Sequence, residues 1–291
     1  MEEREIKGKI LTGERAMFAA VGMKIADCTF EDGESPLKES ADLEIIGSMF
    51  KWKYPLWYCR SVSLENCTFY ENARAGVWYT RGISFRHGII EAPKTFRRST
   101  DITLEDVFMP NASETLWNCS DVKLRSVRAR GDYFAMNVSG GEVDGLDLVG
   151  NYAFDGAKNV TVRNARMLTK DAFWNCENVT VIDSFISGEY LGWNSRNLTL
   201  INCTIESLQG MCYIENLVMK RCRATRTTLA FEYSSCDVDI EGHIDGIYMP
   251  ASGTIRADSA GYVVSDTPND RKTIGGKSYP GEQYACPLKK R

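Results

Sequence analysis

The sequence has few histidines, no basic run and no long apolar segment. Two of its 291 residues are histidines, His87 and His243, so a histidine-centred reaction mechanism is not expected. Lysine and arginine number 35 against 39 acidic residues, and they form no basic cluster of the kind that binds nucleic acid. No segment approaches the roughly 20 apolar residues that cross a bilayer. We therefore expect neither nucleic acid nor a membrane as a partner.

Motifs for export, metal binding and phosphate binding are also missing. The N-terminus, MEEREIKGKILTGERAMF, begins with acidic residues and lacks the apolar run of a signal peptide, so the expected compartment is the cytoplasm. The 10 cysteines form no CxxC pair, and glycine-rich phosphate loops are absent. Because the cysteines recur at fixed repeat positions, we expect small, reduced, packed thiols, and we predict no metal site and no cofactor.

What the sequence does contain is a repeat of 19 to 21 residues. Its clearest copy is Ala172–Ile186, AFWNCENVTVIDSFI, which is matched by TLWNCSDVKLRSVRA at 115–129 and LGWNSRNLTLINCTI at 191–205. The first apolar residue of a strand signature, V-x-L-x-x-C-x-F, recurs at Met23, Leu43, Val62, Ile83, Ile102, Val122, Gly141, Val160, Val179, Leu198, Leu217 and Val238. Such regularity over many copies is typical of a solenoid.

Each copy consists of short strands joined by tight corners. Apolar residues alternate along the copy, which indicates strands. Two columns are rich in Asn, Asp and Gly, which tolerate left-handed backbone: one holds Asp27, Gly47, Asn66, Asp106, Gly145, Asn164, Asp183 and Asn202, and the other Asp101, Asp121, Asn159, Asn178, Asn197 and Asn216. Three strands and three corners per copy predict an all-β fold, a single-stranded right-handed parallel β-helix of about 12 turns. Columns such as Asn118, Asn137, Asn175 and Asn194 should form hydrogen-bonded ladders.

The repeat predicts a single domain over residues 1–291. Residues 1–15 should supply an N-terminal capping strand, Glu5 to Leu11, and residues 16–245 hold the repeats. Residues 246–291 should form the last strands, at 253–255 and 262–264, and a C-terminal cap or tail. Both ends need a cap because an open last turn exposes strand edges and core.

Five of the six tryptophans stand in one column, five residues before the strand signature. The column before it is apolar and should face inward, so the tryptophans should face outward. An outward row of aromatic rings favours carbohydrate binding, because rings stack on sugars. The predicted ligand-binding residues are Trp57, Trp78, Trp117, Trp174, Trp193, Tyr133, Tyr152 and Tyr190. Alternatively, the C-terminal tail covers the row, the row forms a homo-oligomer interface, or the rings merely stack on each other.

Two groups of charged residues near the row are candidate catalytic residues. Asp155 and Asp171 come from successive turns and could form the carboxylate pair of a glycosidase. Lys94 and Arg97 belong to a basic cluster that could hold a uronate carboxylate or supply the base of a lyase. Solvation of these side chains, or pairing of the cluster with Glu91, is the alternative. Whether the protein is an enzyme is left open by these patterns.

The repeated N-[VIL]-T-[VL]-x-N-[CS]-x-[IF] occurs with GERAMF at 13–18, DGESPLKES at 32–40, KWKYPLWYC at 51–59 and EAPKTFRR at 91–98. Over residues 5–260, these segments resemble an uncharacterised bacterial domain-of-unknown-function family of single-domain, pectin-lyase-like β-helix proteins. The resemblance implies the fold but no activity and no catalytic residues.

Because pectin-lyase-like proteins generally use an outer sheet face for polysaccharides, the resemblance favours a carbohydrate-binding β-helix as the first hypothesis. One alternative is a glycoside hydrolase or polysaccharide lyase acting on an acidic or neutral glycan. Another is a structural or protein-interaction solenoid whose tryptophans meet a second chain.

Overall fold

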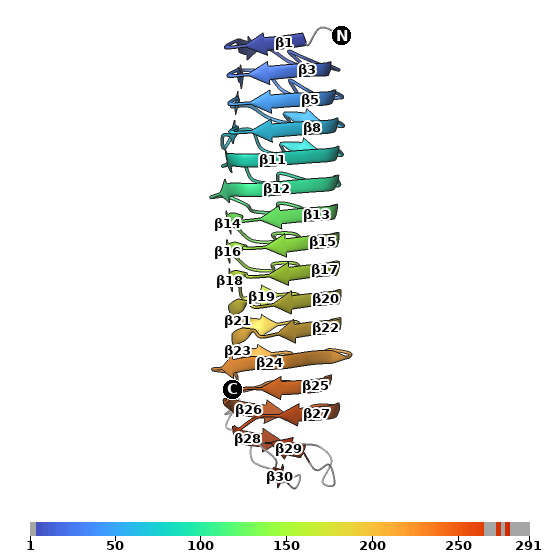
Figure 1. The fold of residues 1–291 in the computed structure, drawn as a ribbon, viewed down its shortest axis with the longest axis vertical. Helices are drawn as coiled ribbons and strands as arrows, with labels where there is room; N and C mark the ends of the chain where they lie inside the picture. Colours follow the sequence, from blue (N-terminus) through green and yellow to red (C-terminus); the bar gives the residue numbers. More distant parts are fainter. Residues whose placement is uncertain (1–3, 265–271, 275–276, 280–291) are drawn as a thin grey trace, which may run out of the picture. The chain divides into compact units, whose positions relative to one another are not determined.

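The computed structural model describes residues 4–264, 272–274 and 277–279. The chain divides into two compact units, the first ending at Phe154 and the second starting at Asp155. All regular elements of the described residues are β-strands (Figure 1). The predicted all-β parallel solenoid is confirmed, with about 14 turns instead of 12. The single domain over residues 1–291 stays a prediction.

The first unit holds sixteen strands. They are β1 (Arg4–Lys7), β2 (Ile10–Thr12), β3 (Val21–Ala26), β4 (Thr29–Glu31), β5 (Ala41–Ile46), β6 (Met49–Phe50), β7 (Leu56–Trp57), β8 (Arg60–Glu65), β9 (Thr68–Phe69), β10 (Val77–Trp78), β11 (Arg81–Ile90), β12 (Thr100–Met109), β13 (Ser120–Arg125), β14 (Arg128–Arg130), β15 (Ser139–Asp144) and β16 (Asp147–Val149).

The second unit continues the numbering. Its strands are β17 (Lys158–Arg163), β18 (Arg166–Leu168), β19 (Asp171–Ala172), β20 (Glu177–Ile182), β21 (Phe185–Leu191), β22 (Arg196–Ile201), β23 (Thr204–Gly210), β24 (Leu217–Thr225), β25 (Ser235–Ile240), β26 (His243–Tyr248), β27 (Ser252–Arg256), β28 (Ser259–Val264), β29 (Lys272–Ile274) and β30 (Lys277–Tyr279).

Equivalent residues of successive turns lie side by side within each unit. In the first unit, β1, β3, β5, β8, β11, β12, β13 and β15 each pair in parallel with the next. Val62 pairs with Ile83, and Ile83 pairs with Ile102, so the repeat position of the sequence is the register of the sheet. In the second unit, β17, β20, β22, β24, β25 and β27 pair in the same way. Like side chains therefore stack on like.

The core is a stack of apolar side chains inside the coil. Phe30 and Phe50 lie face to face, with ring centroids 4.7 Å apart and planes 2° from parallel, and Phe69 meets Phe50 edge-on at 4.8 Å. The apolar column predicted to face inward is buried, with 0% exposure at Leu56 and Phe96. Burial of this area stabilises each turn by roughly 25 cal/mol per Å².

Both predicted corner columns adopt left-handed backbone, with φ between 49° and 72°. Amide side chains in the corners also bond from turn to turn, as predicted. Asn137 donates to Asn118 at 3.0 Å, and Asn194 donates to Asn175 at 2.8 Å. A ladder of four asparagines runs from Asn216 through Asn197 and Asn178 to Asn159, with bonds of 2.8, 2.7 and 3.0 Å.

The described cysteines are free thiols and all are buried, as predicted. Cys59 and Cys119 share one column with Thr80, Ser99 and Ser195, in which a small donor bonds a carbonyl of the preceding turn. Cys59 Sγ donates to the Leu37 oxygen at 3.1 Å, and Thr80 Oγ1, one turn later, donates to the Leu56 oxygen at 2.8 Å. A thiol and a hydroxyl thus make the same hydrogen bond between turns at this position.

The N-terminal end differs from the expected pattern, whereas the expected C-terminal strands are present. Residues 5–11 were expected to form one capping strand, but they form two, β1 and β2, which pair with β3 and β4 as a complete first turn. At the other end, the expected strands at 253–255 and 262–264 lie within β27 and β28. Most of the expected C-terminal tail lies outside the described residues.

Candidate functional site

The tryptophan column lies at a third corner of each turn. In this corner, the outward residue stands between two residues of left-handed backbone. Phe173 and Asn175 flank Trp174 with φ of 57° and 52°. A bulky apolar residue rarely adopts positive φ, so the complete burial of Phe173 offsets the backbone strain. Successive residues point to opposite sides, which leaves the tryptophan outside.

In the first unit, the rings of the row cover each other. The indoles of Trp57 and Trp78 are half-buried, 5.1 Å apart and 5° from parallel. Tyr54 lies against the Trp57 ring at 4.6 Å. The indole N–H groups turn back to the chain, because Trp57 Nε1 donates to the Ala75 oxygen at 2.7 Å and Trp78 Nε1 to the Lys94 oxygen at 2.9 Å.

Arg97 replaces an aromatic ring in the middle of this row. Its Cζ lies 5.3 Å from the Trp78 ring centroid and 4.8 Å from that of Trp117, so the guanidinium is held between two indoles as a cation–π sandwich. Beyond Trp117, the rings of Tyr133 and Tyr152 continue the row, stacked on each other at 4.8 Å.

In the second unit, a shorter row repeats the arrangement. Trp174 and Trp193 stack at 5.7 Å, 11° from parallel, and Tyr190 meets Trp193 edge-on at 5.2 Å. Trp193 Nε1 donates to the Gln209 oxygen at 2.8 Å. Beside them, a hydrogen bond from Lys170 lowers the pKa of Glu189, and the same bond raises the pKa of Lys170.

Stacked neighbours therefore cover one ring face each of Trp57 and Trp78 in the first unit and of Trp174 and Trp193 in the second. A sugar stacks on the face of a ring, where the quadrupole is negative. The arrangement agrees with the alternative in which the rings stack on one another, and it weakens the case for a sugar platform. Ligand binding by this row stays a prediction.

The candidate carboxylate pair is not an open pair. Asp155 is half-buried and accepts a hydrogen bond from Asn175 Nδ2 at 2.9 Å, so it ends an asparagine ladder. Asp171 begins β19 and is 2% exposed. A glycosidase needs both carboxyl groups at the scissile bond, and the burial of Asp171 does not provide that access.

The basic cluster has a carboxylate partner of its own. Glu114 Oε2 accepts a hydrogen bond from Arg97 Nη2, and Glu114 Oε1 lies 3.3 Å from Lys94 Nζ. The carboxylate partner of the cluster is thus Glu114 on the next turn, whereas the sequence suggested Glu91 as the partner. The side chains proposed to hold a uronate carboxylate thus already contact a carboxylate of the chain itself.

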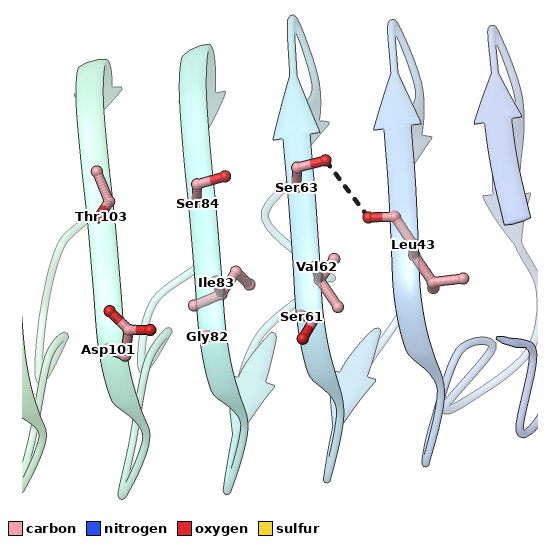
Figure 2. Close-up of a pocket in the computed structure, with 9 residues that line it drawn as sticks. All are labelled: Leu43, Ser61, Val62, Ser63, Gly82, Ile83, Ser84, Asp101 and Thr103. Carbon is pink, nitrogen blue, oxygen red and sulfur yellow. Dashed lines mark hydrogen bonds between the residues drawn. The ribbon is translucent and has the colours of Figure 1, made fainter. Parts of the chain in front are cut away.

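A shallow groove crosses the outer face of β5, β8, β11 and β12 in the first unit. The sheet groove, as we call it, has a volume of about 350 Å³ and is lined by Leu43, Ser61, Val62, Ser63, Gly82, Ile83, Ser84, Asp101 and Thr103. Figure 2 shows Ser63, Ser84 and Thr103 at one level on neighbouring strands, and Asp101 lower on the strand of Thr103, at the level of Gly82 and Ser61. The Ser63 hydroxyl donates to the Leu43 oxygen at 3.4 Å.

Gly82 gives the sheet groove its depth. It occupies a left-handed corner position, with φ of 71°, between Ser61 and Asp101 on the adjacent turns. A Cβ at Gly82 would lie 3.7 Å from Asp101 Oδ2, so the missing side chain leaves the carboxylate accessible. Sequence reasoning missed this groove, although consecutive hydroxyl residues in one outward column, Ser63, Ser84 and Thr103, were visible in the repeat.

No set of three or more metal-ligating side chains is gathered anywhere in the described residues. The same residues contain no helix with the length and hydropathy needed to cross a membrane.

The sequence matches the family model described as "Protein of unknown function (DUF3737)" over residues 4–274. No curated protein matches it. Among solved structures, it is similar to PfbA, a surface adhesin of Streptococcus pneumoniae, with 10% identity, a TM-score of 0.43, and coverage of 96% of this chain and 90% of that one. It is also similar to the A-module of the Azotobacter vinelandii mannuronan C-5 epimerase AlgE6, with 9% identity, a TM-score of 0.41, and coverage of 94% and 90%.

Proposed function

The chain belongs to the DUF3737 family of proteins of unknown function, and we propose that it is a carbohydrate-binding β-solenoid whose ligand lies in the sheet groove. The observation that carries the proposal is the row of hydroxyls on consecutive strands. Ser63 pairs with Ser84, and Ser84 pairs with Thr103, so these hydroxyls repeat at the strand spacing of about 4.8 Å. Each hydroxyl donates and accepts, as sugar hydroxyls do.

The shape of the sheet groove favours a polymer over a small ligand. Sites for small molecules enclose most of the ligand surface, whereas this groove is open along the sheet and lies on a flat face. A chain longer than the groove can therefore lie across it. The Asp101 carboxylate adds a charged acceptor for sugar hydroxyls.

Binding without turnover fits the lining better than catalysis does. Glycosidases use two carboxyl groups, and Asp101 is the one carboxylate among the lining residues. The alternative is a glycoside hydrolase or lyase with Asp155 and Asp171, or Arg97 and Lys94, as catalytic residues. Assays of glycan cleavage by Asp155→Asn and Arg97→Ala test this hypothesis. Cleavage by the wild type that both variants retain would remove these assignments.

The binding test is calorimetric titration of the full chain with neutral and uronate oligosaccharides. Gly82→Asn fills the groove with a residue that tolerates its φ, and it should weaken binding at least about tenfold. Asp101→Asn should weaken binding severalfold. The matched control is Asp121→Asn, in the same corner column one turn beyond the lining residues, which should bind as the wild type does.

Two results would overturn the proposal. One is that no oligosaccharide binds the wild type. The other is that Gly82→Asn binds a glycan as tightly as the wild type does, which would place the site elsewhere on the surface.

A further inference from the structure

The first turn of the described residues has an unpaired strand edge. Among the described residues, β1 pairs only with β3, and β2 pairs only with β4. The core-facing side chains of this turn, Ile6, Leu11 and Met17, are half-buried. Their counterparts on the second turn have 0 to 2% exposure: Ile25, Phe30 and Leu37. Within residues 4–264, the first turn therefore has a neighbouring turn on one side only.

Large apolar side chains surround this end. Ile10 is 69% exposed, Val21 57% and Phe18 43%. Exposed apolar residues beside an unpaired strand edge are the usual setting for strand-to-strand association, and natural proteins protect such edges or use them.

We propose that this end binds the same end of a second copy of the chain. A twofold axis would place the two β1 strands antiparallel and edge to edge, as in other isologous dimers. The joint would bury Ile6, Leu11 and Met17 of both copies and satisfy the free backbone groups of both β1 edges.

The sequence of β1 selects one register for this joint. Directly opposed residues of an antiparallel pair point to the same side, so inward Ile6 must face an inward residue and outward Glu5 an outward one. Pairing Glu5 with Lys7 of the other copy meets this condition, brings Ile6 against Ile6, and forms two opposite-charge pairs. The neighbouring allowed registers would set Glu5 against Glu5 or Lys7 against Lys7, which is unfavourable.

Both charged side chains are accessible for this pairing. Glu5 and Lys7 are exposed. Lys7 Nζ lies 3.8 Å from Asp27 Oδ2 but keeps 68% side-chain exposure, and an exposed ion pair of this kind contributes little. Lys7 can therefore reach a carboxylate on a second chain at small cost.

The test uses charge reversal and sedimentation velocity on the full chain. The wild type should form a dimer. Glu5→Lys and Lys7→Glu should each raise the dissociation constant at least about tenfold, because each places like charges opposite in both pairs. An equimolar mixture of the two variants should recover the dimer, since opposite charges then face each other in both pairs of the mixed dimer.

Glu142→Lys, a charge reversal on the outer face of β15 in the same unit, is the matched control and should leave dimerisation unchanged. Circular dichroism checks that each variant keeps its strands. A wild type that stays monomeric at all concentrations would overturn the proposal. A dimer that both charge-reversal variants retain would also overturn it. The same holds for a dimer that Trp78→Ala abolishes and the charge reversals leave intact. Slow hydrogen exchange of β1 in a monomer would show that this chain covers its own edge.

Discussion

The indoles of Trp57 and Trp78 are stacked 5.1 Å apart and lie 5° from parallel. Each comes from an outward position, yet each is half-buried by its neighbour one turn away. The outer row therefore adds turn-to-turn cohesion to that of the core.

Trp78→Ala should lower the free energy of unfolding by about 2 to 4 kcal/mol, because it removes the stack on Trp57 and one face of the Arg97 sandwich. Urea unfolding measures the change. The control is Tyr70→Ala. The Tyr70 ring is exposed, and its hydroxyl lies 3.6 Å from the Met49 sulfur. This variant should lower the free energy of unfolding by less than about 0.5 kcal/mol. Equal effects of the two variants would contradict a structural role for the row.

An oligosaccharide that binds in the sheet groove should leave tryptophan emission unchanged, because no tryptophan lines the groove. Fluorescence recorded during the calorimetric titration checks this expectation. Quenching by a glycan in the wild type, absent in Trp57→Leu, would show instead that the aromatic row carries the ligand.

Arg97 and Glu114 should be strongly coupled. Their side chains are 21% and 30% exposed, so water screens the ion pair less than it does at an open surface. A double-mutant cycle with Arg97→Met and Glu114→Gln should give a coupling free energy of about 1 to 3 kcal/mol. The matched pair Arg196 and Glu215, 59% and 67% exposed at 3.0 Å, should give less than about 0.5 kcal/mol. Similar values for both pairs would refute the distinction.

Stability should fall in alkali as the buried thiols resist ionisation. Burial raises the pKa of Cys59 from 9.0 to about 11 and that of Cys119 to about 12. Below pH 9 both states keep the proton and stability is complete. Above pH 9, the thiol ionises in the unfolded state first. Each thiol therefore lowers the free energy of unfolding by about 1.4 kcal/mol per pH unit until the pH reaches its folded-state pKa.

Urea unfolding between pH 7 and about 11 measures this slope. Cys119→Ser is the informative variant, because the hydroxyl of Ser99 already occupies the same column and bonds the Val77 oxygen at 3.4 Å. It should fold normally and show a shallower decline. An unchanged slope would assign the alkaline loss to other groups.

Asn178→Ala should destabilise the second unit by about 1 to 2 kcal/mol. It breaks two ladder bonds and places alanine at a φ of 57°. Asn178→Gly breaks the same bonds without the backbone strain and should cost less. Thermal unfolding ranks the two; an alanine variant at least as stable as the glycine variant would contradict this account of the corner.

The repeat position, the inward column and the corners could be predicted, because Asn, Asp and Gly mark left-handed backbone by their own chemistry. At the third corner, the left-handed backbone of the residue before the tryptophan column could not be predicted. Phe96, Leu116 and Phe173 adopt it there, although such residues disfavour that conformation intrinsically, because the core needs their side chains.

The site was harder to predict for a related reason. A column of tryptophans suggests a ligand surface when each turn is considered alone, but stacking of neighbouring turns covers the ring faces. The burial of Asp171 and the pairing of Arg97 with Glu114 likewise depend on side-chain positions in adjacent turns. The sheet groove depends on Gly82, a single absent side chain between two polar ones.

The residue-by-residue pairing of successive turns also limits how the chain can change in length. Losing one residue inside β20 would turn every later outward side chain of that strand into the core, whereas losing one complete repeat would leave each remaining strand facing an equivalent partner. Length variation in this protein should therefore come in whole repeats or at corners, and the number of repeats can differ between relatives while each turn keeps its form.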